Sequence, residues 1–199
     1  MIHDISVFLS NQLVQKEIVE SDYRSIYEYG IELIVSSLIG ITLILSIGLL
    51  WFSIADAIIF LIAFIALRAT AGGYHAKSYF TCNLCSVTSF IVVSLLARSD
   101  FLTSNWLITL LSFGALILMF LSPIEHEYKP IDSQDRNKLK LFCLATFTVM
   151  SMCTLIMAHW SIHLHRQLAF TMISVVLFAI LGYIEHKINR KEKKNEKNC

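Results

Sequence analysis

A histidine and a cysteine seven positions apart, His75 and Cys82, are the residues in this sequence whose types and spacing best suit chemistry. They lie in the stretch RATAGGYHAKSYFTC, residues 68–82. Two adjacent glycines, Gly72 and Gly73, predict that a helix ends there and that His75 lies in the turn that follows. A thiol with a neighbouring histidine as its base is the minimum arrangement for covalent acyl transfer.

The helix expected after this turn places Cys82 where a negative charge on its sulfur is stabilised. Ser78 is a residue type that favours the N-cap position, so Cys82 falls in the first turns of that helix. The positive end of the helix dipole, Lys77 and a protonated His75 all favour the thiolate. Most isolated Cys–His pairs carry out no chemistry. Here the glycines, the helix start and a position at the edge of the membrane, which the apolar runs of the chain predict, together favour a nucleophile. Backbone amides around Cys82 are the expected oxyanion donors, and a third residue that would orient His75 stays open.

Long apolar runs must position this stretch. Of the 199 residues, 56% are hydrophobic and 16% are charged, whereas soluble domains carry about 25% charged residues. The mean hydropathy is +0.65. A membrane-spanning helix needs about 20 apolar residues, and the uncharged runs meet or approach this length at 33–55, 78–97, 101–124, 141–158 and 167–184. A shorter segment, 53–72, is a further expected span, with Asp56 and Arg68 near opposite interfaces and Arg68 able to snorkel to the headgroups. We therefore predict an all-α polytopic membrane protein with about six transmembrane helices.

The distribution of basic residues predicts the orientation of these spans. With six spans both termini lie on the same side of the membrane. If that side is cytoplasmic, all of the 16 lysine and arginine residues except Arg98 and Arg166 fall in cytoplasmic segments. Both termini are therefore expected in the cytoplasm, and His75 and Cys82 are expected at the cytoplasmic edge.

Three segments are expected along the chain. Residues 1–30 form an amphipathic N-terminal helix, because Ile2, Ile5, Phe8, Leu9 and Leu13 share one face at helical spacing. This helix either lies along the cytoplasmic leaflet as an interfacial helix or packs on the cytoplasmic face of the protein itself, and the pattern favours neither. Residues 31–186 form the six-span membrane domain, and residues 187–199 form a charged cytoplasmic tail.

The run RATAGGYHAKS followed by Cys82 resembles the AgrB (accessory gene regulator protein B) family of quorum-sensing peptide processors. A second stretch, SPIEHEYKPID at residues 122–132, is similar to the proline-and-lysine loop of that family. The order of the spans and the amphipathic N-terminus also agree, so the resemblance covers most of residues 1–185. The first motif is the more specific of the two.

The resemblance implies a cysteine endopeptidase embedded in the plasma membrane of a bacterium and acting on an AgrD-type pro-peptide. His75 and Cys82 fall on the catalytic positions of the family, while Arg68 and Gly73 fall on flanking motif positions. The implied reaction releases the C-terminal tail of the pro-peptide and leaves the remainder as a thioester on Cys82. A nucleophile within the peptide then closes a thiolactone or lactone ring. The resemblance also implies a homodimer.

Lys129 and Pro130 lie in the expected cytoplasmic loop between the fourth and fifth spans, where they would contact an acidic peptide tail. An ordinary positive-inside role for Lys129 is equally supported by the sequence.

Other functional classes stay open or are disfavoured by the residues. A non-enzymatic transporter or exporter fits the spans, although the sequence has few of the intramembrane charges that mark a transport path. Cys82 and Cys85 form a C-x-x-C pair, which leaves thiol–disulfide exchange open, but a second ligand pair for zinc is absent from the sequence around it. No metal or cofactor is expected, and a net charge of +1 gives no reason to expect nucleic acid.

Overall fold

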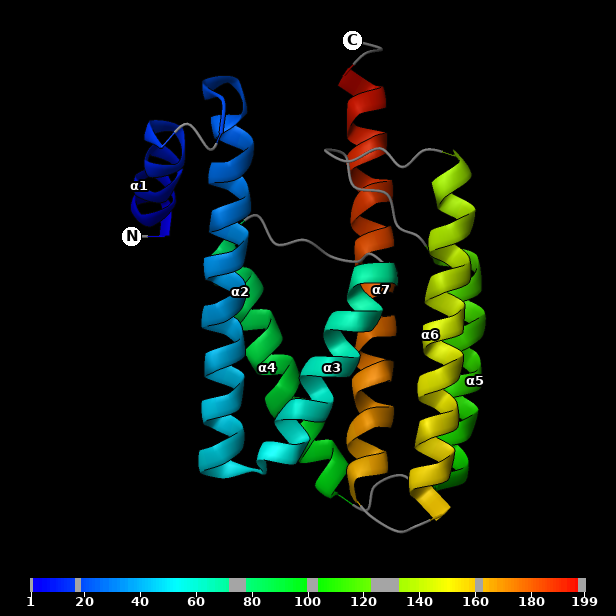
Figure 1. Ribbon diagram of the computed structural model, residues 1–199. Coiled ribbons are helices and arrows are strands. Elements are labelled where there is room, and N and C mark those ends of the chain that lie inside the picture. The colour runs from blue at the N-terminus through cyan, green and yellow to red at the C-terminus, as the bar shows by residue number, and fades with distance from the viewer. Residues whose placement is uncertain are drawn as a thin grey trace.

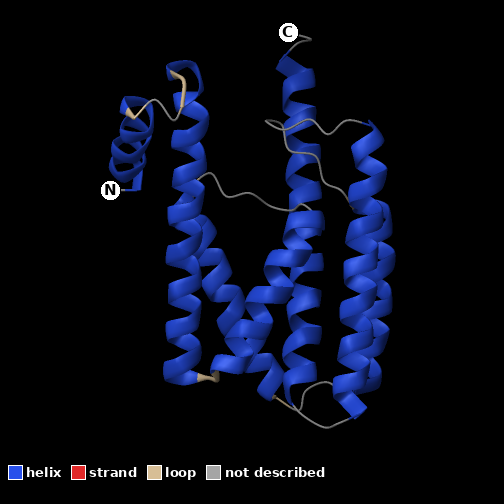
Figure 2. Ribbon diagram, viewed as in Figure 1, coloured by secondary structure: helices blue, strands red, loops and turns tan. Residues whose placement is uncertain are grey.

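The computed structural model describes residues 2–16, 19–71, 78–99, 104–122, 133–159 and 163–196, and every regular element in these ranges is helical (Figures 1 and 2). A short 3₁₀ turn, Ser21–Tyr23, precedes the second helix. The α-helices, in chain order, are α1 (Ile2–Gln15), α2 (Arg24–Trp51), α3 (Ile54–Ala71), α4 (Tyr79–Arg98), α5 (Ser104–Leu121), α6 (Ser133–His159) and α7 (His163–Glu196).

Five helical segments among the described residues are long and apolar enough to cross a membrane: Ser21–Trp51, Ile54–Ala71, Tyr79–Arg98, Arg136–His159 and Leu164–Ile188. A further apolar segment, Trp106–Leu121 of α5, is shorter. Large apolar side chains such as Leu49, Phe113 and Phe120 are exposed on the outside of the bundle, as expected for a surface that faces lipid. The prediction of an all-α polytopic membrane protein is confirmed. The count of six spans stays a prediction.

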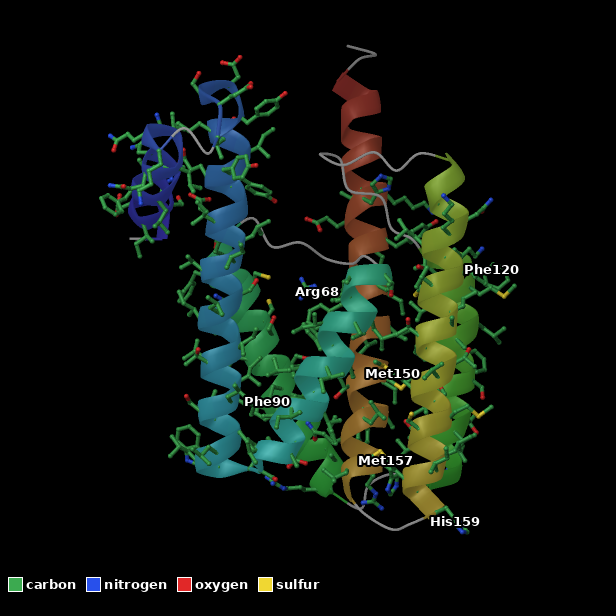
Figure 3. The ribbon with its side chains drawn as sticks, viewed as in Figure 1. Arg68, Phe90, Phe120, Met150, Met157 and His159 are labelled. Atoms are coloured by element: carbon green, nitrogen blue, oxygen red, sulfur yellow. The ribbon has the colours of Figure 1, made fainter. Side chains whose placement is uncertain are left out.

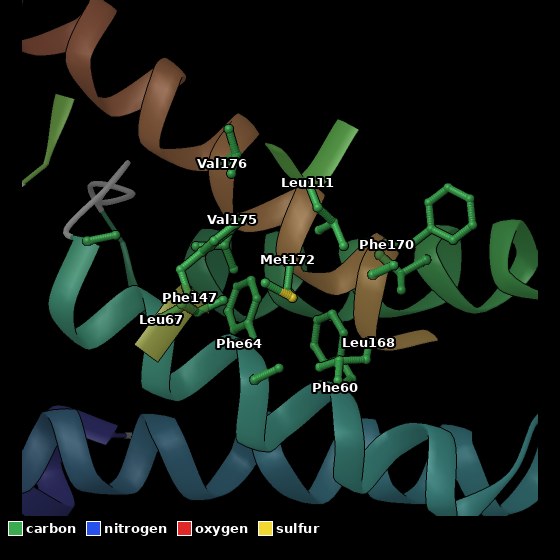
Figure 4. Packing of buried hydrophobic residues seen from close by; sticks show 14 of the residues in the cluster. Phe60, Phe64, Leu67, Leu111, Phe147, Leu168, Phe170, Met172, Val175 and Val176 are labelled. Carbon is green, nitrogen blue, oxygen red and sulfur yellow. The ribbon is translucent and has the colours of Figure 1, made fainter. Parts of the chain in front are cut away.

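Helix α7 is the centre of the bundle, because α3, α4, α5 and α6 all pack against it (Figure 1). In its apolar segment 56% of the residues are buried, against 39% or less in each of the others. Figure 4 shows the side chains of Phe60 and Phe64 on α3 meeting Met172 and Val175 on α7. The rings of Phe60 and Phe64 stack with centroids 5.0 Å apart. This apolar core holds the half of the bundle that surrounds α7.

Helices α2 and α3 are joined by a tight connection that requires a glycine. A Cβ atom on Gly48 would lie 2.6 Å from the Cβ of Ala57, closer than real Cβ contacts allow. The carbonyl of Gly48 also accepts the backbone N–H of Phe52, which ends α2. The absence of a side chain at Gly48 therefore allows the two helices to meet closely.

An ion pair between an exposed arginine and a buried aspartate joins α3 to α4 at the end of the bundle where α3 begins. Arg98 Nη2 lies 3.1 Å from Asp56 Oδ2, and the Asp56 side chain is only 2% exposed. Gln167 of α7 donates from Nε2 to Ser94 Oγ at 3.1 Å and to the Asp56 carbonyl at 3.4 Å. Asp56 and Arg68 lie in the first and last turns of α3, as expected, but Asp56 is buried in a polar cluster formed by three helices.

Helix α1 packs against the first half of α2 (Figure 1). Its contact face is small and polar, since Ser6 and Ser10 are buried there. Ile5, Phe8 and Leu9 are exposed, with Phe8 at 62%. The amphipathic pattern is therefore present, and its apolar face points away from the protein.

Candidate active site at the start of helix α4

Cys82 lies in the first turn of α4, and Ser78 is the N-cap of this helix as predicted. Ser78 has extended backbone angles, φ −136° and ψ 148°, and its hydroxyl accepts the backbone N–H of Thr81 at 3.2 Å. The backbone N–H of Cys82 donates to the Ser78 carbonyl at 3.0 Å. The Cys82 side chain is half-buried and its thiol is free. The helix dipole at this position favours negative charge on the sulfur.

The guanidinium of Arg68 lies beside this thiol. Arg68 Nη2 is 3.9 Å from Cys82 Sγ, within hydrogen-bonding reach for sulfur. The guanidinium carbon also lies 5.3 Å from the ring centroid of Phe64 and 5.5 Å from that of Phe178. Arg68 is half-buried at the end of α3 (Figure 3), where its guanidinium contacts the thiol and the two rings. A cation held in this way stabilises a thiolate or an oxyanion formed next to it.

The expected oxyanion donors around Cys82 are partly occupied. The amides of Thr81 and Cys82 already donate to Ser78, through its side chain and its carbonyl respectively. They are therefore not available to a substrate without disrupting the helix start. Arg68 is the better-placed donor among the residues that the structure describes near Cys82.

Several predicted site residues lie outside the described part of the chain. These are Gly72, Gly73 and His75 in the turn before α4, and Lys129 and Pro130 in the segment between α5 and α6. The His75–Cys82 pairing therefore stays a prediction. Cys85, one turn beyond Cys82, is a half-buried free thiol.

The structure adds polar residues that the sequence analysis did not select. Tyr79 donates its hydroxyl to Glu32 Oε2 on α2 at 2.9 Å, and Asn83 donates to the Ser36 carbonyl at 3.1 Å. The sequence pattern that could have indicated these residues is a spacing of four. It separates Tyr79 from Asn83 and Glu32 from Ser36, and it places each pair on one face of its helix.

Glu32 also binds α1. Its Oε1 atom lies 2.8 Å from His3 Nδ1 and accepts the Ser6 hydroxyl at 3.2 Å. The hydrogen bond to Glu32 raises the pKa of His3 above its usual value, with a smaller contribution from the charge of Glu28. Among the described residues, His3, Glu28 and Glu32 are the one group whose side chains lie close enough to share a metal ion, and Cys82 is not part of it.

The fold and this site define a helical, multi-pass membrane protein with a thiol–guanidinium pair at the start of one of its helices. Residues 6–186 match the accessory gene regulator B family, AgrB, and the chain belongs to this family. That membership supports a role in the accessory gene regulator quorum-sensing system.

Individual relatives agree with the family. A putative AgrB-like protein of Clostridium perfringens (strain SM101 / Type A) is 28% identical over 191 residues, covering 92% of this chain and 87% of that protein. A putative AgrB-like protein 2 of C. perfringens strain 13 is 26% identical, covering 81% and 82%. Protein FsrB of Enterococcus faecalis is 24% identical and covers 64% of this chain and 54% of that protein. No solved structure matches the chain.

Proposed function

We propose that the protein is a cysteine endopeptidase of the cell membrane that removes the C-terminal tail from an AgrD-type signalling pro-peptide. In this proposal Cys82 is the nucleophile, His75 is the general base and then the acid, and Arg68 stabilises charge at the reacting atoms. The observation that carries the proposal is the 3.9 Å approach of the Arg68 guanidinium to the Cys82 sulfur at a capped helix start. Family membership provides independent support for a peptide-processing role.

The first step is an acyl transfer to the thiol. The Cys82 thiolate attacks the carbonyl carbon of the scissile peptide bond, so a C–S bond forms and the carbonyl oxygen becomes an oxyanion. The Arg68 guanidinium, 3.9 Å from the sulfur, is well placed to stabilise that charge. When the C–N bond breaks, the amine of the tail leaves with a proton from His75. The N-terminal part of the pro-peptide remains bound to Cys82 as a thioester.

The second step returns the thiol. A cysteine or serine side chain within the bound peptide attacks the thioester carbonyl, its proton passes to His75, and the bond to Cys82 Sγ breaks. A thiolactone or lactone ring results. Because water would hydrolyse the same thioester, the site must restrict water, and a half-buried Cys82 at the edge of an apolar bundle suits this requirement.

We also propose that this chemistry takes place on the cytoplasmic side, where both termini would lie. The start of α1 and the end of α7 lie in the same half of the molecule (Figure 1). Lys129 and Pro130 would contact the acidic tail of the pro-peptide from the same side. The homodimer implied by the family stays a prediction.

Co-expression with the cognate pro-peptide tests the function. Cys82→Ala is expected to abolish the cleaved product, because no other described thiol has Arg68 beside it. Cys85→Ser is the matched control, and its processing is expected to stay near that of the native chain. Mass spectrometry of the native protein, isolated while it is processing the pro-peptide, should find a peptide thioester on Cys82.

Three outcomes would contradict the proposal. Unchanged processing by Cys82→Ala would exclude Cys82 as the nucleophile. Equal damage from Cys85→Ser and Cys82→Ser would favour thiol–disulfide exchange instead. Absence of a peptide thioester on Cys82 would favour a non-enzymatic transporter.

A further inference from the structure

We infer that a polar interface between α2 and α4 sets the rotation of α4 about its own axis and thereby directs Cys82 toward Arg68. This inference rests on the proposed function, because it assigns positioning residues to the proposed nucleophile. The residues of the polar interface face one another across the α2–α4 contact: Glu32, Ser36 and Gly40 on α2, and Tyr79 and Asn83 on α4.

Asn83 lies directly after Cys82 and is held closely against α2. Its Nδ2 atom donates to the Ser36 carbonyl at 3.1 Å and to the Ser36 hydroxyl at 3.2 Å. A Cβ atom on Gly40 would lie 2.7 Å from Asn83 Oδ1, too close for an ordinary contact. Gly40 therefore leaves the space into which the Asn83 carboxamide fits.

Tyr79 makes the second contact, one turn earlier on the same face of α4. Its hydroxyl donates to Glu32 Oε2 at 2.9 Å. The other carboxylate oxygen of Glu32 is held by Ser6 and His3 of α1. Burying a polar side chain among apolar helices costs free energy unless the side chain is hydrogen-bonded. Hydrogen bonds between helices and small residues that allow close approach both stabilise the association of membrane helices.

In the first half of α4, Val87 packs partly buried against the apolar core, but no residue of this half is fully buried. All of the buried residues of α4, Phe90, Val93, Ser94 and Ala97, lie in the second half of the helix. Apolar packing is therefore densest at the far end of α4, while the polar interface supplies the contacts to α2 in the turns around Cys82. This division is the observation that separates a positioning role from general packing.

The direction of the thiol follows from helical geometry. Tyr79 and Asn83 are four residues apart and share one face, whereas Cys82 precedes Asn83 by about 100° around the axis. That rotation turns Cys82 away from α2 and toward Arg68 of α3. If α4 rotates, the thiol moves along an arc away from the guanidinium.

The test measures two rates, the alkylation of the Cys82 thiol and the processing of the pro-peptide. The other cysteines are replaced by serine, and the rate at which a small maleimide alkylates Cys82 is measured in native membranes. Asn83→Leu removes the donor with little change in size, and Tyr79→Phe removes only a hydroxyl. For Asn83→Leu we expect the alkylation rate to fall by about threefold or more, because Arg68 no longer stabilises the reactive thiolate. Pro-peptide processing should fall by about tenfold or more, because small displacements of reacting groups are costly.

Matched controls lie on α2, the helix that Asn83 and Tyr79 contact. Ser46 and Thr42 have exposed hydroxyls that donate to carbonyls of their own helix. Ser46 donates to the Thr42 carbonyl and Thr42 to the Leu38 carbonyl, each at 2.8 Å. Ser46→Ala and Thr42→Ala should leave both rates unchanged. Gly40→Ala should slow both when Asn83 is present and have no further effect in an Asn83→Ala background, because the side chain that it displaces is then gone.

The outcomes distinguish the two proposals. An unchanged or raised alkylation rate in both Asn83→Leu and Tyr79→Phe would overturn the positioning role, even if Cys82 is the nucleophile. If Cys82→Ala processes the pro-peptide normally, the proposed function fails, while the alkylation rates still report whether the polar interface directs the thiol. Additive effects of Gly40→Ala and Asn83→Ala would also contradict the inference.

Discussion

At the scale of single residues, Arg68 has two kinds of partner at once. Its guanidinium lies between 5 and 6 Å from the Phe64 and Phe178 ring centroids while Nη2 is 3.9 Å from the Cys82 sulfur. A planar, weakly hydrated cation can lie on aromatic rings and still direct an N–H group sideways. The compact, strongly hydrated ammonium of lysine cannot do both.

Arg68→Lys therefore tests whether geometry or charge alone matters. We expect processing to fall by about tenfold or more although the positive charge is kept, because the ammonium loses the directed N–H group. The measurement is the initial rate of product formation with the cognate pro-peptide. Arg24→Lys, an exposed conservative change at the start of α2, is the control. Native rates for Arg68→Lys would show that no directed guanidinium contact is needed.

At the scale of elements, α1 contacts α2 through a histidine that bonds a carboxylate. His3 Nδ1 lies 2.8 Å from Glu32 and 3.4 Å from Glu28, and Asp4 adds a further negative charge nearby. The hydrogen bond to Glu32 raises the pKa of His3 in the folded protein. Stabilisation from this group is therefore fully present below the unfolded pKa, about 6.5, and is lost as the pH rises through the higher folded value.

We expect α1 to be held more firmly against α2 at about pH 5.5 than at about pH 8.5, on either side of the histidine titration range. Hydrogen exchange of the α1 amides, corrected for the intrinsic effect of pH, measures this difference. His3→Gln should remove most of the pH dependence while leaving α1 in place through Ser6. Equal protection at both pH values in the native chain would refute this role for His3.

At the scale of the whole molecule, α3 and α4 are linked at both ends. Arg68 and Cys82 meet at one end, and Asp56 and Arg98 form a pair at the other. Between these two points the rings of Phe60 and Phe90 pack edge to face with centroids 5.3 Å apart, and both helices pack on α7. The ion pair therefore ties the ends of two helices whose opposite ends carry the candidate site.

We expect Asp56→Ala to destabilise the protein by about 1 kcal/mol, because the removed carboxylate is buried and paired, whereas the Arg98 charge that remains is partly solvated. Asp56→Ala combined with Arg98→Ala should recover part of that loss. Thermal unfolding in detergent, followed by the temperature at which the protein aggregates, measures both. If the double replacement is no more stable than the single one, the pair contributes nothing specific.

Much of the architecture was predictable because its causes are local. Runs of apolar residues predict helices that cross a membrane, and such helices are observed at α2, α3, α4, α6 and α7. The N-cap role of Ser78 and the place of Cys82 in the first turn also depend only on neighbouring residues. Burial of the Asp56 carboxylate was not predictable, since its partner Arg98 is 42 positions away.

The contacts that make the candidate site were decided by the packing of helices. The Arg68–Cys82 approach joins residues 14 positions apart on two helices, and the Asn83–Ser36 bond joins residues 47 positions apart. Hydropathy predicts that each helix lies in the membrane, but it does not predict how each helix is rotated about its own axis relative to its neighbours. That rotation depends on which side chains pair and where a glycine leaves space, so only the tertiary structure shows that Cys82 faces a guanidinium.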